Sequence, residues 1–137
     1  MMERRHPRNV PSRPLVLVAD DYPDTRDMYV TTLAAFGFEA VPVSQCADTF
    51  RRAWERHPDA IVADLPLLDA GGWQLIQHLK QDARTRDIPI VLLSGHAARS
   101  VRERAALEGC AAYFVKPCPP EELAVTVRHV VETNSAG

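Results

Sequence analysis

Five short apolar runs alternate with five segments of helical periodicity, and this alternation limits the fold more than any other feature of the chain. Four of the runs lack the polar alternation of a half-solvated strand, which indicates strands covered on both faces. Strands that alternate with helices predict right-handed βαβ crossovers and a parallel sheet between two layers of helices. The predicted strands are Leu15–Ala19, Ala40–Val43, Ala60–Ala63, Ile88–Leu93 and Ala111–Val115.

The segments between the runs carry apolar residues at helical spacing. Tyr29, Leu33 and Phe36 fall at positions i, i+4 and i+7. Gly37 follows as the expected end of that helix. The fifth helix is expected to begin at Pro120, because proline and the two glutamates after it suit a helix N-terminus. The other predicted stripes are Ala47, Phe50 and Trp54; Ile76, Leu79 and Ala83; and Val101 and Ala105, in a helix that ends near Gly109.

Length and composition narrow the class of protein. A chain of 137 residues with a net charge of -2 has the size of one domain and lacks the basic field of a nucleic-acid-binding protein. No apolar run reaches the roughly 18 residues of a membrane span, and the basic start lacks the apolar stretch of a secretory signal. These features predict a cytoplasmic protein. Residues 1–13 are predicted to be a disordered basic tail, residues 14–133 the domain, and residues 134–137 a short C-terminal tail.

Polar residues stand where the apolar runs end. Ligand sites in doubly wound sheets lie beyond the carboxyl ends of the strands, so these residues are expected to converge. Two adjacent carboxylates need a cation, since charges roughly 4 Å apart repel by about 4 kcal/mol at an effective dielectric near 20. Clustered carboxylates with one lysine suit Mg²⁺ and a phosphoryl group, and an aspartate can act as the nucleophile toward phosphorus. The strand-end residues are Asp20, Asp21, Asp64, Ser94 and Lys116.

Four motifs carry a family resemblance: "ADD" after the first run, "IVADL", "IPIVLLSGHA" and "GCAAYFVKP". In this order and at these separations, they resemble the response-regulator receiver domains of two-component signalling, from Leu15 to about Glu132. The resemblance implies a flavodoxin-like, doubly wound α/β fold. It would have a five-stranded parallel sheet in the order 2-1-3-4-5 and five helices.

The resemblance also implies roles for individual residues. Asp64 would accept the phosphoryl group and would also be a ligand of a Mg²⁺ ion. Asp21 would bind the same ion directly, and Asp20 would bind it mainly through water. The backbone carbonyl of Pro66 would be a further metal ligand. Ser94 and Lys116 would contact the phosphoryl oxygens. Ser94 and Tyr113 would be the switch residues.

Three local features bear on how such a site would behave. The family usually has a proline four residues after the acceptor, whereas here Leu68 holds that position and Pro66 lies two residues after Asp64. Pro66 and His96 are therefore candidates for tuning the lifetime of the phosphoryl group, with a solvated loop residue as the alternative for His96. The resemblance also implies a cis peptide bond before Pro117.

The expected function is that of a stand-alone receiver, not an enzyme, although it could hydrolyse its own acyl phosphate. A histidine kinase or a histidine phosphotransfer protein would be the donor. Output would pass to a protein target through the face around Tyr113 and the last two helices, or the phosphoryl group would be relayed onward. Direct nucleic-acid binding is not expected, and homodimer formation is left open.

Two other interpretations use the same residues. In the first, the fold serves as an interaction module that is never phosphorylated. In the second, the protein is an enzyme, such as a small aspartyl-phosphate phosphatase, or a flavin carrier. The chain lacks an acid two residues after Asp64 and a glycine-rich loop after the first strand, so the second has little support.

Overall fold

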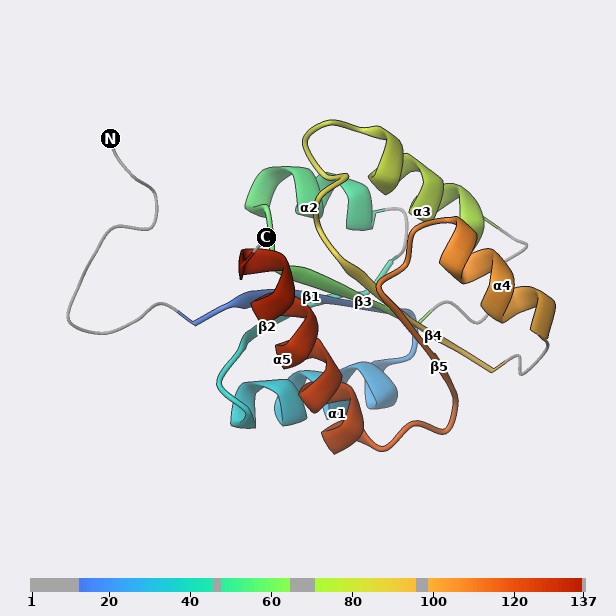
Figure 1. Cartoon of the computed structure of the whole chain (residues 1–137). Helices are drawn as coiled ribbons and strands as arrows, with labels where there is room; N and C mark the ends of the chain where they lie inside the picture. The colour runs from blue at the N-terminus through green and yellow to red at the C-terminus, as the bar shows by residue number, and fades with distance from the viewer. Residues whose placement is uncertain (1–12, 46–47, 65–70, 96–98, 137) are drawn as a thin grey trace, which may run out of the picture.

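The computed structural model describes residues 13–45, 48–64, 71–95 and 99–136, and it shows one sheet between two layers of helices (Figure 1). No helix in these ranges is both long and apolar enough to cross a membrane. Strands and helices alternate along the chain as the sequence predicts. The elements are β1 Leu15–Asp20, α1 Pro23–Ala35, β2 Glu39–Val43, α2 Thr49–Arg56, β3 Ala60–Asp64, α3 Gly72–Gln81, β4 Ile90–Ser94, α4 Arg99–Leu107, β5 Ala112–Val115 and α5 Pro120–Ala136.

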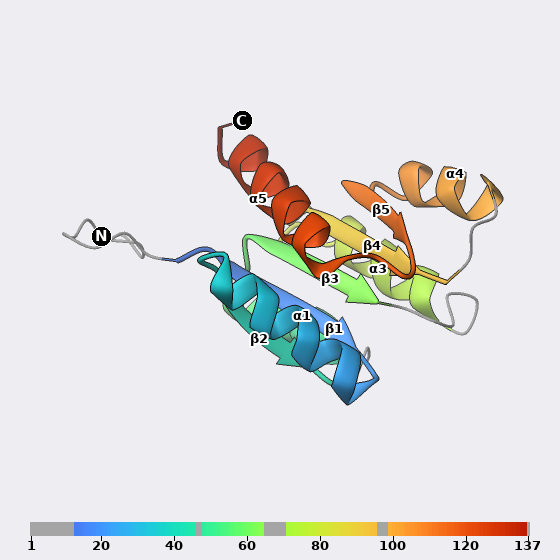
Figure 2. The same ribbon diagram turned by 90° about the horizontal axis from the view of Figure 1, so that it is seen from below.

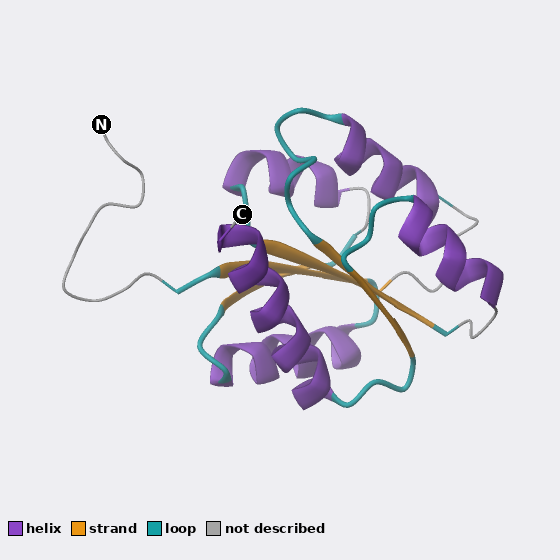
Figure 3. Cartoon of the chain, in the orientation of Figure 1, coloured by secondary structure: helices purple, strands orange, loops and turns teal. Residues whose placement is uncertain are grey.

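The five strands form one sheet in the order β2-β1-β3-β4-β5, and every neighbouring pair is parallel (Figure 3). Both the strand order and the number of helices agree with the predicted doubly wound fold. Because all strands run the same way, their carboxyl ends lie along one edge of the sheet, which Figure 2 shows from below. The order reverses between β1 and β3, and the rule for such sheets places a ligand site there.

The helices cover the sheet on both faces. Helices α1 and α5 lie on one face, and α2, α3 and α4 lie on the other (Figure 1). Alternate residues of each strand supply the two cores: Val16 and Val18 of β1 pack on the α1 and α5 side, whereas Leu17 packs on the opposite side. This arrangement explains why the central strands appear in the sequence as continuous apolar runs.

The edge strands are less covered than the sequence predicts. Every residue of β1 except Leu15, and every residue of β3 and β4, is buried. In contrast, all four residues of β5 are half-buried, and β2 has one buried residue, Val43. An edge strand has a neighbour on one side only, so the helices leave part of it accessible.

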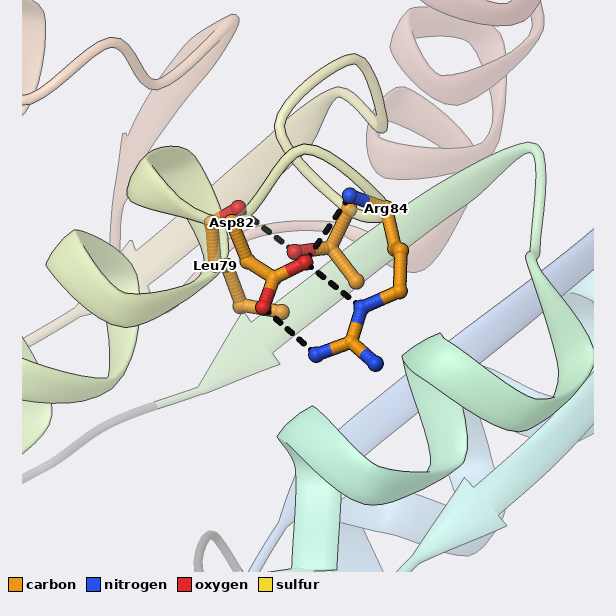
Figure 4. Close-up of polar contacts among 4 residues, drawn as sticks. Leu79, Asp82 and Arg84 are labelled. Atoms are coloured by element: carbon orange, nitrogen blue, oxygen red, sulfur yellow. Dashed lines mark hydrogen bonds and ion pairs between the residues drawn. The ribbon is translucent and has the colours of Figure 1, made fainter.

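Helix α3 ends earlier than predicted, at Gln81, and Ala83 is exposed beyond it. Figure 4 shows Leu79, Asp82 and Arg84 at this end of the helix. The Thr85 hydroxyl donates a hydrogen bond to the Leu79 carbonyl, at 2.7 Å, and so satisfies a backbone group there. Arg84 forms a two-pronged pair with the carboxylate after the helix, that of Asp82, at 2.9 and 2.7 Å. The side-chain and backbone hydrogen bonds that Arg84 donates hold the pKa of Asp82 well below its ordinary value.

Trp54 is 46% exposed and does not belong to the buried stripe that was predicted for α2. The Arg84 guanidinium lies over its ring, 4.5 Å from the centroid. A cation over the ring accounts for a large aromatic side chain at the surface, because the contact covers one face of the indole. Ala47, the first residue of the same predicted stripe, lies outside the described residues.

Helices α1 and α5 also differ slightly at their ends from the prediction. Helix α1 ends at Ala35, and Phe36 caps it in place of forming its last turn. Helix α5 begins at Pro120 as expected and continues to Ala136, into the segment that the sequence assigns to a C-terminal tail.

Gly37 stops α1 by adopting a backbone conformation with φ of +98°, and a Cβ atom there would lie 3.4 Å from the Arg128 guanidinium. We expect Gly37→Ala to lower the free energy of unfolding by about 1–2 kcal/mol, the usual cost of the left-handed region for a residue with a Cβ. Urea unfolding would measure the loss. Gly95→Ala is the matched control, since Gly95 has open space around it and should change stability by less than about 0.5 kcal/mol. Equal effects of the two substitutions would contradict this account.

Candidate functional site

Three of the predicted site residues are the last residues of neighbouring strands. Asp20 ends β1, Asp64 ends β3 and Ser94 ends β4. Asp20 and Asp64 are direct partners in the register of the two strands. All three side chains are buried, with 1%, 0% and 0% exposed. The topology therefore brings two carboxylates and a hydroxyl together at one edge of the sheet.

Lys116, which follows β5, neutralises the more buried of the two acids. Its Nζ atom lies 3.0 Å from Asp64 Oδ1 and 3.1 Å from Oδ2. Its backbone N–H donates a hydrogen bond to the Ser94 carbonyl, at 2.8 Å, so β4 and β5 remain joined up to the site. The peptide bond between Lys116 and Pro117 is cis, which confirms the expectation from the family resemblance.

Asp20 is held in place by the start of α1. Its Oδ1 atom accepts a hydrogen bond from the Tyr22 backbone N–H, at 2.9 Å, and its carbonyl accepts one from Arg26 Nη1, at 3.0 Å. Its Oδ2 atom is buried and has no hydrogen-bond partner. Such an oxygen costs free energy unless something binds it. The carboxylate is thus oriented by the protein, with one oxygen left for a ligand.

The pKa of Asp20 is raised from an ordinary value of 3.8 to about 6, chiefly by burial. The Asp64 carboxylate contributes to this rise, by its charge and by accepting a hydrogen bond from the protonated form. The Tyr22 N–H and the Lys116 charge act in the opposite direction and do not cancel these effects. Loss of solvation in the buried site is therefore the main reason that this carboxyl is harder to ionise, and the Lys116 charge does not offset it.

Asp21 occupies a different environment from its neighbour, because its side chain is exposed. Within the described parts of the chain, no three His, Cys, Asp or Glu side chains gather as a metal-binding group. Mg²⁺ needs only one or two carboxylates, since water and phosphate oxygens complete its shell. Asp20 and Asp64 supply two, and the unpartnered Oδ2 of Asp20 is an oxygen of the kind that this ion binds. The donor set fits Mg²⁺ in its chemistry.

Tyr113 lies in β5, on the same face of the sheet as Ser94. Ser94 pairs in register with Val115, and Tyr113 is two residues before Val115, so the two side chains point to one side. Tyr113 is half-buried and packs against the core on the α4 side. The guanidinium of Arg102, from α4, lies 5.1 Å from the centroid of its ring. Two other predicted site residues, Pro66 and His96, fall outside the described residues.

Sequence reasoning missed two residues near the site. Arg26 contacts the Asp20 carbonyl, and the only signal in the sequence was its place one turn into the first helix. Tyr29 was predicted as a core residue and is indeed buried. Burial, with smaller contributions from Asp64, Cys118 and Asp20, raises its pKa to about 12. Its phenol therefore stays neutral beside the acidic site.

The comparisons with known proteins agree with this geometry. The family model for the response regulator receiver domain matches residues 16–128. The chain belongs to the family of response regulator receiver domains, which are signalling domains of two-component systems.

Relatives of the chain include both longer proteins and proteins of similar size. It is 33% identical over 116 residues to the phosphate regulon transcriptional regulatory protein PhoB of Escherichia coli (strain K12), which covers 85% of this chain and 51% of PhoB. It is 26% identical over 113 residues to the polar-differentiation response regulator DivK of Brucella abortus (strain S19), covering 82% of this chain and 92% of DivK. The chain thus spans about half the length of PhoB and most of the length of DivK.

Solved structures show the same fold. The chemotaxis response regulator CheY4 of Vibrio cholerae matches with a TM-score of 0.78 at 23% identity, over 87% of this chain and 99% of that one. A sensor protein from Polaromonas sp. JS666 matches with a TM-score of 0.80 at 27% identity, over 90% and 99% of the two chains.

Proposed function

We propose that this receiver accepts a phosphoryl group on Asp64 from a phosphohistidine of a histidine kinase or a histidine phosphotransfer protein, in the cytoplasm, and signals through protein contacts. The observation that carries the proposal is the buried Asp64 carboxylate, which Lys116 contacts through both oxygens at the end of a central strand. Membership of the receiver family supports the same assignment.

The proposed reaction is a displacement at phosphorus. A carboxylate oxygen of Asp64 attacks the phosphorus atom, the P–N bond to the donor imidazole breaks, and the imidazole leaves with that electron pair. Lys116, which contacts both Asp64 oxygens, would pair through its ammonium with an oxygen of the arriving phosphoryl group. Ser94, buried at the end of the adjacent strand, would donate a hydrogen bond to another oxygen.

A bound Mg²⁺ ion would supply positive charge that offsets the repulsion between the phosphoryl oxygens and the carboxylates. Asp20, Asp21 and Asp64 would hold it, with the Pro66 carbonyl as the further ligand that the resemblance implies. The buried Asp20 Oδ2 atom, which has no hydrogen-bond partner, supports this role, because a bound cation would offset the cost of burying that oxygen.

The output that we propose uses Ser94 and Tyr113. If Ser94 moves toward a new phosphoryl oxygen, it vacates space on the face of the sheet that it shares with Tyr113. A ring that is half-buried in an edge strand can respond to a bias of a few kcal/mol. A protein target would bind the surface of α4, β5 and α5 with an affinity that depends on this change.

An interaction module that is never phosphorylated is the second candidate. One observation favours it: the Lys116–Asp64 pair is complete without a ligand. The two functions differ in whether the protein gains a covalent group. Incubation with acetyl phosphate and Mg²⁺, followed by intact-mass measurement, should show one added phosphoryl group per chain, and EDTA should prevent it. An unchanged mass with acetyl phosphate and with phosphorylated histidine kinases would favour the second candidate.

Saturating Mg²⁺ should raise the melting temperature, because an ion that binds only the folded state stabilises it by mass action. Asp21→Asn should reduce this shift, since it removes one proposed ligand. A melt series in EDTA and in increasing Mg²⁺ would measure both effects. Asp27→Asn, an exposed change on α1, is the control and should keep the full shift. A melting temperature that does not change with the Mg²⁺ concentration would count against the proposed metal site.

A further inference from the structure

Two arginine side chains of helix α4 lie over aromatic rings of neighbouring elements, in addition to the apolar contacts of the helix. Ala105 is its buried residue, and Val101 packs on the core from a half-buried position. The guanidinium of Arg104 lies 4.6 Å from the centroid of the Trp73 ring, at the start of α3. Arg102 makes the corresponding contact with Tyr113, at 5.1 Å. Both distances fall within the range of cation–π attraction, which extends to about 6 Å.

The contact of Arg102 is specific for one orientation of the Tyr113 ring. A cation is attracted to the face of an aromatic ring and not to its edge, so the attraction is lost if the ring turns or moves away. Arg102 is exposed on α4, and Tyr113 is half-buried in the edge strand, so part of each side chain is not covered by the core. A contact between two such groups can select between conformations.

We propose that Arg102 is a positioning residue that holds Tyr113 in the orientation of the unphosphorylated protein. Through this contact, α4 is coupled to the phosphorylation state of the site. The inference rests on the proposed function in one respect: it takes Tyr113 to change orientation on phosphorylation. Loss of the Arg102 cation should shift Tyr113 toward its phosphorylated orientation. A cation–π contact at an exposed site corresponds to about a two- to fivefold change in the ratio of two states.

The test is Arg102→Met, which removes the cation and keeps a long apolar side chain over the ring. The NMR shifts of the Tyr113 ring, in the unphosphorylated protein, should move toward those of the phosphorylated wild type. Phosphorylation by acetyl phosphate should become about two- to fivefold faster, since more molecules start in the favoured state. Arg102→Lys, which keeps a positive charge, should restore most of the wild-type behaviour.

Two further variants of α4 separate positioning from a general weakening of the helix. Arg104→Met removes the contact with Trp73 and leaves Arg102 in place, and Arg99→Met changes an exposed residue at the start of α4. Both should leave the Tyr113 shifts as in the wild type. In a Tyr113→Leu background, Arg102→Met should no longer change the phosphorylation rate, because the ring that it acts on is gone.

Tyr113 shifts that stay at the wild-type position in Arg102→Met would overturn the inference. An acceleration that persists in the Tyr113→Leu background would overturn it as well. A wild-type protein that never gains a phosphoryl group would instead defeat the proposed function. In that case the ring shifts of unphosphorylated Arg102→Met and Arg99→Met would still decide whether Arg102 holds Tyr113.

Discussion

Replacing Asp64 with asparagine is expected to abolish phosphorylation by acetyl phosphate while leaving the fold intact. The amide keeps the size of the side chain and removes the oxygen nucleophile that the reaction needs. Asp64 is fully buried beside Asp20, whose carboxylate already feels the Lys116 charge, so in the variant the lysine keeps a negative charge close by and the fold should be kept. Intact mass after incubation with acetyl phosphate and Mg²⁺ measures the loss, and circular dichroism checks the fold.

The control for this experiment is an acid outside the site. Asp27→Asn changes an exposed carboxylate of α1 and should be phosphorylated like the wild type. Peptide mapping of the wild-type adduct should place the phosphoryl group in the peptide that contains Asp64. A stoichiometric adduct in the same peptide of the Asp64→Asn protein would refute the assignment of Asp64 as the acceptor.

Replacing Asp20 with asparagine should stabilise the metal-free protein at neutral pH. The folded-state pKa of Asp20 is about 6, whereas the ordinary value is 3.8. A carboxyl whose pKa is raised by folding favours the folded state while it is protonated, so its contribution is full below about pH 4 and is lost as the pH rises to about 6. The shift of about two units corresponds to a penalty of up to about 3 kcal/mol at pH 7, which asparagine would remove.

Urea unfolding in EDTA between pH 4 and pH 7 would measure this difference. The variant should exceed the wild type in unfolding free energy at pH 7, and the two should converge near pH 4. Asparagine can still accept the hydrogen bond from the Tyr22 N–H, so the orientation of the side chain should be kept. Asp27→Asn should differ from the wild type by less than about 0.5 kcal/mol at every pH. If the Asp20→Asn protein is no more stable than the wild type at pH 7, burial of this charge carries no such cost.

The carboxyl ends of the strands could be predicted from the sequence because two simple rules act together. Parallel strands end at one edge of the sheet, and each apolar run shows where its strand stops. Asp64 and Ser94 therefore lie at the carboxyl ends of their strands, as expected. Each strand continues one residue beyond its predicted end, at Ala63 or Leu93, and so includes the polar residue. The roles of these residues in catalysis and metal binding remain predictions.

The different environments of Asp20 and Asp21 could not be predicted from their adjacent positions. Asp20 is the last residue of β1 and lies on the same face as Val16 and Val18, so it is buried. Asp21 lies just beyond the strand and is exposed. A shift of one residue in the end of the strand would exchange these environments, and sequence patterns do not locate strand ends that finely.

Contacts between long side chains were also beyond sequence analysis. The Arg84 guanidinium over Trp54 and the Arg102 guanidinium over Tyr113 depend on rotamers and on the packing of elements that are distant in the chain. Arginine side chains have several rotatable bonds, so the sequence gives no reason to prefer one aromatic partner over another. Spacing along the helix identified the buried positions and left these surface contacts undetermined.

The contrast between buried central strands and half-buried β5 has a consequence for how the protein tolerates change. The proposed acceptor belongs to a strand in which substitutions disturb a packed core, with costs of about 2–5 kcal/mol for a large residue cut to alanine. The proposed output surface belongs to an edge, where substitutions disturb much less. Sequence variation in β5 and α4 could therefore alter which protein is recognised without loss of the fold that holds Asp64. The chemistry and the choice of target would then be able to evolve separately within one small domain.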